Sequence, residues 1–235
     1  LKKYFKVGDK SFLHAVDGIN MKVYAGETIG VVGESGCGKS TLGRTILRLI
    51  EPTSGQILYN GDDITKYNTR QMKKMRQELQ IIFQDPYASL DPRKSVIEII
   101  AEYMIINKTL PKKREIFNRA AHLMDVVGLA RRYATAYPHE LDGGRRQRIG
   151  IARALSVNPK FIVCDEPVSA LDVSIQAQIL NLLMDLQDDM GLTYMFVTHD
   201  LSVVKHISDN IMVMYLGQCL ELTSSDELFA KPVHP

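Results

Sequence analysis

The stretch that decides the fold is Gly33-Glu34-Ser35-Gly36-Cys37-Gly38-Lys39-Ser40-Thr41. Its residues fit the spacing of a phosphate-binding loop. A short apolar segment from Thr28 to Val32 precedes the loop, and a helical pattern begins near Lys39. Because a phosphate loop connects a buried strand to a helix, this context supports the match, and the sequence predicts an α/β fold built around it.

The residue types of this loop explain how it could hold phosphate. Glycines let successive backbone N–H groups turn inward, and the start of the following helix adds positive potential. Lys39 supplies a point charge, and the Ser40 hydroxyl is a ligand suited to Mg²⁺. The alternative is a glycine-rich turn without a ligand, which the strand and helix on either side make the weaker interpretation.

Polar side chains follow three other apolar segments. Asp165 and Glu166 end the segment that starts at Phe161, and ligands of open α/β sheets bind outside the carboxyl ends of strands. Neighbouring side chains on an extended segment point in different directions, so Asp165 can face a metal held at Ser40 while Glu166 faces an attacking water. Taken without the loop, an acid after a strand is as often the cap of the next helix.

Two further strand-end residues are candidates of the same kind. His199 could donate a hydrogen bond to a γ-phosphate, although a single histidine is more often structural. Gln84 could ligate Mg²⁺ or hold a water through its amide oxygen, and taken by itself it is uninformative.

Composition excludes several classes of protein. The chain has 235 residues, 45% hydrophobic and 24% charged, which favours one domain with a smaller attached lobe. The net charge of +2 does not call for a nucleic-acid partner, and the basic residues 112–114 are interpreted as a solvated helix face. Three scattered cysteines fit a reducing cytosol. We find no signal peptide and no apolar run near the roughly 18 residues that cross a bilayer, so any membrane role is expected to come from a partner.

The order of predicted elements is that of an α/β protein with a parallel sheet. Extended segments with a turn near Gly8-Asp9 fill residues 1–24, and Gln56 to Gly61 is predicted as another strand. Strand signals vanish from 96 to 137, which indicates an inserted helical lobe. Three strands follow, at 161–164, 193–197 and 211–215. Between the first two, one buried helix face is predicted to carry Ile175, Ile179, Leu182 and Leu186.

Taken together these residues resemble the ATP-binding cassette (ABC) family, over essentially the whole chain and in the right order. The discriminating stretch is similar to the signature of that family and reads Leu141-Asp142-Gly143-Gly144-Arg145-Arg146-Gln147. The resemblance implies an α/β P-loop NTPase fold of the ABC type, with a mostly parallel core sheet, an antiparallel β subdomain and an inserted helical lobe. It implies a single domain over 1–235, in which about 1–95 and 157–235 form the core and β subdomain, and about 96–156 the helical lobe.

The resemblance also implies a role for each candidate residue. In that family two cassettes sandwich two ATP molecules, so Asp142, Gly143 and Gly144 would contact ATP bound to the partner, and Asp172, in the loop from Ser169, would lie at the dimer interface. Glu166 would be the catalytic base, His199 the γ-phosphate switch and Asp165 a metal-side carboxylate. Gln84 would serve both the metal and the contact to membrane subunits. Tyr4 matches the aromatic that stacks on adenine, with Phe5 as its competitor.

Two stretches narrow the resemblance to the oligopeptide and dipeptide branch, namely residues 83–93 and 137–141. The closing stretch, 227–235, is similar to the segment that precedes a C-terminal extension in that branch. The implied activity is ATP hydrolysis with Mg²⁺ at the cytoplasmic face of a membrane. The implied partners are a second ATPase, identical or a sister, two transmembrane permease subunits and, indirectly, an extracytoplasmic solute-binding protein; no nucleic acid is implied. Relatives in this branch also move nickel or glutathione. The alternatives from other classes are a soluble cassette ATPase of DNA repair or translation and a phosphate-loop kinase.

The chain departs from the family pattern inside the signature, where Asp142 replaces the usual Ser and Arg145 the usual Gln. A carboxylate near the partner's γ-phosphate predicts repulsion. Arg145 lies three residues further on, within helical reach, and is expected to pair with Asp142. The alternative is that both side chains point to solvent and Asp142 only caps the helix.

Overall fold

The computed structural model describes residues 1–9 and 11–233 and divides into two compact units, Leu1–Leu79 with Thr193–Pro235, and Gln80–Leu192. The predicted helical lobe, 96–156, falls wholly within the second unit, and the exact lobe boundaries stay a prediction. In the described part of the chain, no helix is long and apolar enough to cross a membrane.

The first unit is built around the strand that leads into the phosphate loop. Strand β3 (Thr28–Val32) is buried throughout and pairs in parallel with β8 (Thr193–Val197) on one side and β9 (Asn210–Tyr215) on the other. Strand β10 (Gln218–Ser224) returns antiparallel to β9. The predicted strands at 28–32 and 193–197 are confirmed at their stated bounds, and the one at 211–215 begins a residue earlier.

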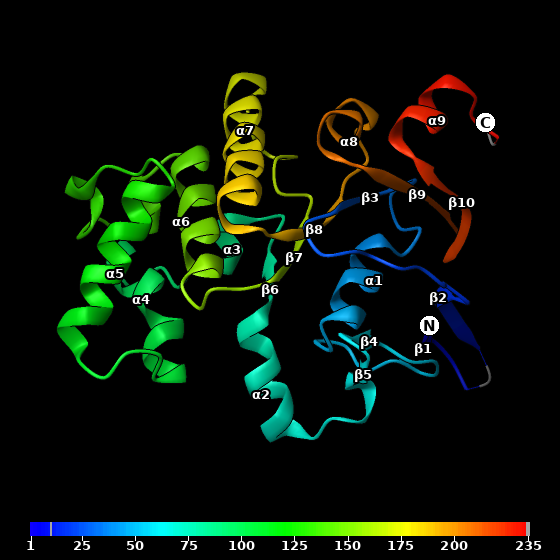
Figure 1. Cartoon of the computed structure of the whole chain (residues 1–235), viewed down its shortest axis with the longest axis horizontal. Helices are drawn as coiled ribbons and strands as arrows, with labels where there is room; N and C mark the ends of the chain where they lie inside the picture. The colour runs from blue at the N-terminus through cyan, green and yellow to red at the C-terminus, as the bar shows by residue number, and fades with distance from the viewer. Residues whose placement is uncertain (10, 234–235) are drawn as a thin grey trace. The chain divides into compact units, whose positions relative to one another are not determined.

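Helices cover both faces of these strands (Figure 1). Helix α1 (Lys39–Ile46) follows the loop, and α8 (Leu201–Ile207) and α9 (Ser225–Ala230) lie on the other side. An apolar cluster joins β3, α8, β9 and α9 through Val32, Val204, Ile211 and Leu228. The last two residues of the stretch 227–235 lie outside the described residues.

The amino-terminal segments form small antiparallel pairs. Strands β1 (Lys2–Lys6) and β2 (Phe12–Asp17) are the predicted extended segments and pair antiparallel, and the prediction is too long because residues 18–24 are not strand. The strand predicted from Gln56 to Gly61 is wrong in length, because β4 spans Leu58–Tyr59 and pairs with β5 (Asp62–Asp63). Asn60 and Gly61 have φ of 50° and 89°, a left-handed turn that ends the strand. A short 3₁₀ turn, η1 (Ile64–Lys66), and α2 (Thr69–Glu78) complete this region.

The second unit is mostly helical, and residues 96–137, where the strand signal is missing, form helices and turns as predicted. Strands β6 (Leu79–Ile82) and β7 (Phe161–Asp165) are sheet neighbours. The helices are α3 (Pro86–Ser89), α4 (Val96–Asn107), α5 (Lys113–Val126), α6 (Gly143–Leu155) and α7 (Val173–Met190), with 3₁₀ turns η2 (Arg131–Tyr133) and η3 (Pro138–Glu140). Helix α4 starts at a capping box, in which Glu98 accepts from the Ser95 backbone N–H at 2.9 Å.

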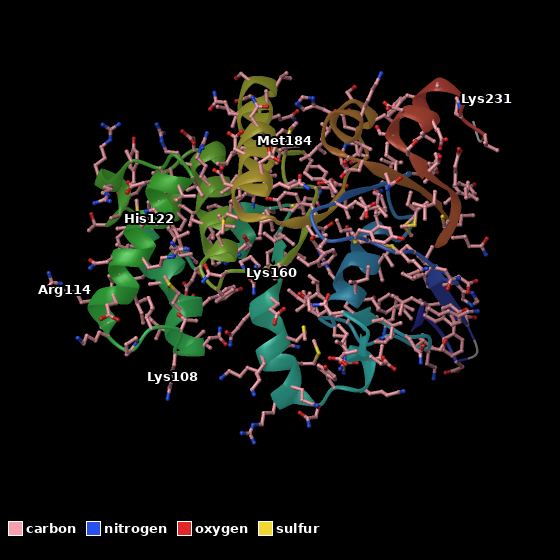
Figure 2. The ribbon with its side chains drawn as sticks, viewed as in Figure 1. Lys108, Arg114, His122, Lys160, Met184 and Lys231 are labelled. Atoms are coloured by element: carbon pink, nitrogen blue, oxygen red, sulfur yellow. The ribbon has the colours of Figure 1, made fainter. Side chains whose placement is uncertain are left out.

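The burial of two helices in this unit tests two of the predictions. The buried face of α7 consists of Ile179, Leu180, Leu183 and Leu186, so the prediction is right for Ile179 and Leu186, whereas Ile175 and Leu182 are partly buried. Leu180 and Leu183 complete the buried face in their place. Residues 112–114 are exposed, and Arg114 extends outward in Figure 2, as a solvated helix face requires.

Candidate functional site

Glycines shape the phosphate loop in the first unit. Gly33, Gly36 and Gly38 have φ of 150°, 79° and 109°, values in the left-handed region that side chains disfavour. A Cβ at Gly33 would lie 2.1 Å from the Met214 oxygen, and one at Gly38 would lie 1.9 Å from the Ala15 oxygen. The loop is therefore pressed against β9 and β2, and neither position can accept another residue without moving that backbone.

The turn between β9 and β10 contacts the phosphate loop through backbone hydrogen bonds. The Gly217 N–H donates to the Cys37 carbonyl at 2.8 Å, and the Gly217 carbonyl accepts from Asp17 N–H at 2.7 Å. Cys37 is itself buried. The turn thus ties the loop to the β1–β2 hairpin through backbone hydrogen bonds, which fixes the loop before any ligand binds.

Lys39 is held inside the loop. Its side chain is 5% exposed, and Nζ donates to the carbonyls of Gly33 at 2.8 Å and Glu34 at 2.9 Å. These partners are neutral main-chain oxygens, so the positive charge is oriented without being neutralised. A buried ammonium at a helix start, in a loop too tight for side chains, fits a phosphate group.

Tyr4 is already engaged by its neighbours in the hairpin. Its hydroxyl donates to Asp17 Oδ1 at 2.5 Å, and its ring stacks on His14 with centroids 3.9 Å apart. The hydrogen bond from Tyr4, with a further contribution from Lys2, lowers the pKa of Asp17 to about 2. Phe5 follows Tyr4 along the strand and therefore points to the opposite face of the hairpin.

His199 is exposed and lies where the sequence predicts, two residues after β8 in the segment that joins it to α8. The next residue, Asp200, caps α8 by accepting from the Ser202 N–H at 2.8 Å, and its own N–H donates to Thr198 Oγ1 at 3.1 Å. This local network fixes the backbone on either side of His199.

The second unit brings together two candidates that are 82 residues apart in sequence. Gln84 Nε2 donates to Glu166 Oε2 at 2.8 Å. Glu166 follows β7 with φ of 48°, an uncommon left-handed conformation for a glutamate, whereas Asp165 is fully buried at the strand end. Burial raises the pKa of the preceding Cys164 thiol, which stays protonated. The two acids therefore differ in burial and in backbone conformation.

The signature residues form the start of α6. Asp142 is the N-cap and accepts from the Arg145 N–H at 2.8 Å, and the Arg145 guanidinium also pairs with the second carboxylate oxygen. The Arg145 Cζ lies 5.0 Å from the Tyr133 ring centroid. The predicted Asp142–Arg145 pair is present and Asp142 also caps α6, so the alternative in which Asp142 only caps the helix is wrong.

Gly143 and Gly144 permit close packing of α6 against the segment that contains Asp172. A Cβ at Gly143 would lie 3.1 Å from Leu171 Cδ2, and one at Gly144 would lie 2.7 Å from Ile175 Cγ2. Asp172 precedes α7 as its N-cap without using its side chain for the cap. The start of α6 and the loop before α7 are thus one packed surface.

Sequence reasoning missed the residues that support these candidates. Met214, Ala15 and Gly217 brace the loop through backbone atoms, which leave no side-chain signal in the sequence. Arg153 is 8% exposed on α6 and donates to the Ser89 carbonyl at 2.6 Å. A charged residue among Ile149, Ile151, Ala152 and Ala154 was the available clue.

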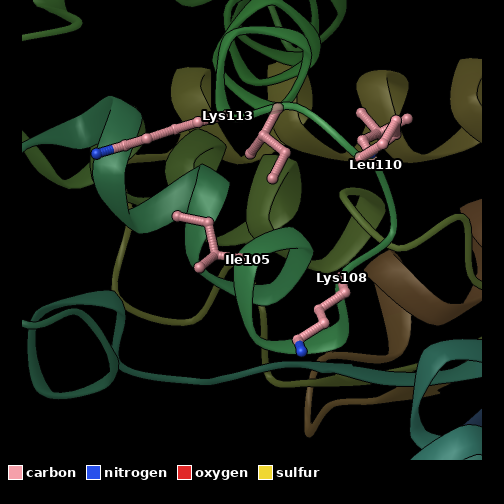
Figure 3. A pocket seen from close by; sticks show the side chains of 6 residues that line it. Ile105, Lys108, Leu110 and Lys113 are labelled. Carbon is pink, nitrogen blue, oxygen red and sulfur yellow. The ribbon is translucent and has the colours of Figure 1, made fainter.

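One pocket lies elsewhere in the second unit, between the end of α4 and the start of α5. It has a volume of about 500 Å³ and is lined by Ile105, Lys108, Leu110, Pro111, Lys113 and Ile116 (Figure 3). None of these residues is a predicted site residue, so the pocket is separate from the candidates above.

A phosphate loop after a parallel strand, with acids at the end of another strand, defines the class of phosphate-loop ATPases. The model of the family described as ABC transporter matches residues 16–169. This chain belongs to that family and is an ATP-binding ATPase.

Individual relatives agree over the whole length. The oligopeptide transport ATP-binding protein OppF of Bacillus subtilis is 53% identical and covers 100% of this chain and 77% of its own length. The dipeptide transport ATP-binding protein DppF of Escherichia coli is 48% identical over an alignment that covers 100% of this chain and 72% of DppF. Among solved structures, the ATP-binding cassette MJ0796, dimeric in a post-hydrolysis state with ADP and Pi, has a TM-score of 0.85 at 29% identity, covering 95% of this chain and 96% of that one.

Proposed function

We propose that this chain is the ATP-hydrolysing subunit of an importer of oligopeptides or dipeptides. The observation that carries the proposal is the sequence identity to OppF and DppF, which is 53% and 48% over the whole of this chain. The names of these relatives state oligopeptide and dipeptide transport. Import of nickel or glutathione by the same type of subunit is the alternative kept from the sequence.

In this proposal the phosphate loop, Gly33 to Thr41, holds the phosphates of ATP, and Lys39 turns from the loop carbonyls toward them. Ser40, Gln84 and Asp165 are the oxygen donors suited to Mg²⁺. When bound, Mg²⁺ would neutralise charge on the β- and γ-phosphates. The proposed adenine platform is an aromatic of β1. The contacts of Tyr4 with His14 and Asp17 favour Phe5, the competitor kept from the sequence, over Tyr4.

Glu166 is the proposed general base, and Gln84 and His199 assist it. The hydrogen bond from Gln84 to Glu166 occupies one oxygen of the carboxylate that would accept a proton from water. We infer that this hydrogen bond orients the Glu166 carboxylate. The Gln84 amide has a separate oxygen, which would be the donor to Mg²⁺ while Nε2 holds the carboxylate.

The proposed partners follow from the same family membership. The partner would be a second cassette, either identical or a sister subunit. Its bound ATP would contact Asp142, Gly143 and Gly144 of this chain, and Asp172 would lie at the interface. Two permease subunits would bind this chain and hold it at the cytoplasmic membrane face, and a solute-binding protein would act through them. The dimer of MJ0796 with ADP and Pi supports the assembly of two cassettes.

Affinity capture tests the proposal most directly. The tagged full chain, expressed in its own cells and extracted in mild detergent, is expected to recover two polytopic membrane subunits and to hydrolyse ATP. Vesicles containing that complex are expected to accumulate a labelled di- or oligopeptide in the presence of ATP. Recovery of ribosomes or DNA would contradict the assignment to a transporter. Uptake of nickel in place of peptide would contradict the assigned solute.

A further inference from the structure

Helix α6 presents two arginines to the segment that carries Gln84. Arg146 and Arg153 are seven residues apart and therefore lie on one face of the helix, two turns from each other. The α3 helix, which begins two residues after Gln84, packs beside α6 in the second unit (Figure 1). The face of α6 that bears both arginines is the face turned to that segment.

Arg153 makes the deeper of the two contacts. It is 8% exposed, donates to the Ser89 carbonyl at 2.6 Å, and its Cζ lies 6.0 Å from the Phe83 ring and 5.7 Å from the Tyr103 ring. Phe83 immediately precedes Gln84, and Ser89 ends α3. One guanidinium thus holds both ends of the segment 83–89, and its planar fork and flat faces suit this combination of carbonyl and rings better than an ammonium would.

Arg146 contacts the middle of the same segment. Its Nε donates to the Leu141 carbonyl at 2.8 Å, and its Cζ lies 5.2 Å from the Tyr87 ring. Leu141 adjoins Asp142, so this side chain connects the signature to the exposed face of α3. The two arginines together contact residues at the beginning, middle and end of 83–89.

We propose that Arg146 and Arg153 are positioning residues that clamp the segment 83–89 to the signature helix, so that Gln84 and the start of α6 move as one body. The inference rests on the proposed function, because it assigns to these arginines a role in placing Gln84 for hydrolysis. Arg153 acts through the backbone of Ser89 and the ring of Phe83, which adjoins Gln84.

A double-mutant cycle in the assembled complex tests the clamp. Arg153→Lys keeps the charge and loses the fork, and is expected to lower kcat by about ten- to a hundredfold while KM for ATP changes little, as for a displaced catalytic group. Gln84→Ala is expected to lower kcat as well, and the double variant to be no slower than Gln84→Ala, because the arginine acts through that residue. Arg114→Lys, on the exposed face of α5, is the matched control and should hydrolyse at the parental rate.

Hydrogen exchange of the isolated full chain provides a readout that does not depend on turnover. Amides of 83–90 are expected to exchange about tenfold faster in Arg153→Lys while those of α5 are unchanged. If Arg153→Lys fails to fold, Arg146→Lys takes its place in both measurements. Parental exchange in 83–90, or rate effects of Gln84 and the arginine that multiply in the double variant, would overturn the clamp. A parental complex that does not hydrolyse ATP would instead overturn the proposed function, and hydrogen exchange would still decide the clamp.

Discussion

Glu166 combines an uncommon backbone conformation with a hydrogen bond from Gln84, which makes it the clearest residue to test. Glu166→Gln is expected to bind ATP with nearly parental affinity and to lose about 10²–10⁴-fold in turnover, because a general base contributes on that scale while the phosphate loop is unchanged. Phosphate release and nucleotide affinity measured on the same preparation check both halves. Hydrolysis near the parental rate would remove Glu166 from the catalytic role.

Asp142 and Arg145 form the second residue-scale test. A carboxylate about 5 Å from a γ-phosphate costs on the order of 3 kcal/mol at an effective dielectric near 20, whereas the helix cap contributes about 1 kcal/mol. The Arg145 guanidinium, paired with Asp142, offsets that repulsion. Arg145→Gln is therefore expected to raise the ATP concentration for half-maximal dimerisation with the cognate cassette by about tenfold, at fixed salt.

The matched variant is the double change Asp142→Ser with Arg145→Gln, which removes the charge and its partner together. It is expected to dimerise more readily than Arg145→Gln, by light scattering across a range of ATP concentrations. Equal dimerisation of the two variants would mean that the pair is a neutral departure from the family pattern.

At the scale of elements, two of the glycines of α6, Gly144 and Gly150, have opposite surroundings. A Cβ at Gly150 meets nothing within 4 Å, whereas one at Gly144 would meet Ile175 Cγ2 at 2.7 Å. Gly150→Ala is expected to raise the free energy of unfolding by up to about 1 kcal/mol through helix propensity. Gly144→Ala is expected to lower it by about 1–2 kcal/mol, because Ile175 is β-branched and cannot easily move aside. Urea unfolding of both variants decides; destabilisation by Gly150→Ala would contradict the helix argument.

The β1–β2 hairpin makes a pH-dependent prediction. Asp17 has a pKa of about 2, lowered mainly by the Tyr4 hydroxyl and then by Lys2. Tyr4→Phe is expected to raise that pKa toward the ordinary value of about 3.9, as followed by a carbon NMR titration of Asp17. Because the folded pKa is depressed, the stabilising effect is complete above pH of about 4 and is lost as pH falls toward 2. An unchanged Asp17 pKa in Tyr4→Phe would show that Lys2 carries the shift.

At the scale of the whole molecule, predicted site residues come from both compact units. The first unit carries the phosphate loop and His199, and the second carries Gln84, Glu166 and the signature. A ligand that binds the folded chain and not the unfolded chain stabilises the folded state by mass action. ATP at a hundred times its Kd is expected to add about 2.7 kcal/mol, which raises Tm by roughly 5–10 °C for a chain of this size.

Lys39→Ala provides the specificity control for that shift. It is expected to weaken ATP binding about ten- to a hundredfold, because the Lys39 charge faces the phosphates in the ground state as well. At the same ATP concentration the stabilisation then falls from about 2.7 kcal/mol to between about 1.4 and about 0.4 kcal/mol. Lys160→Ala, an exposed lysine, should behave as the parent. A full thermal shift in Lys39→Ala would mean that ATP binds away from the loop.

The sequence by itself determined whatever depends on residues close together along the chain. The spacing from Gly33 to Thr41 predicts the loop, the apolar run from Thr28 to Val32 predicts β3, and the three-residue separation of Asp142 and Arg145 predicts their pair. Backbone preferences and side-chain periodicity act over a few residues, so a local pattern is sufficient for such features.

Only the tertiary structure decided which distant groups meet. Gln84 and Glu166 are 82 residues apart, and nothing in either segment specifies that their side chains share a hydrogen bond. The engagement of Tyr4 by His14 and Asp17 depends on hairpin register, and the buried face of α7 depends on α6. Arg153 acquires its partners only when α6 packs on α3. The physical reason is that burial and non-local contacts are set by the path of the whole chain, which local preference does not contain.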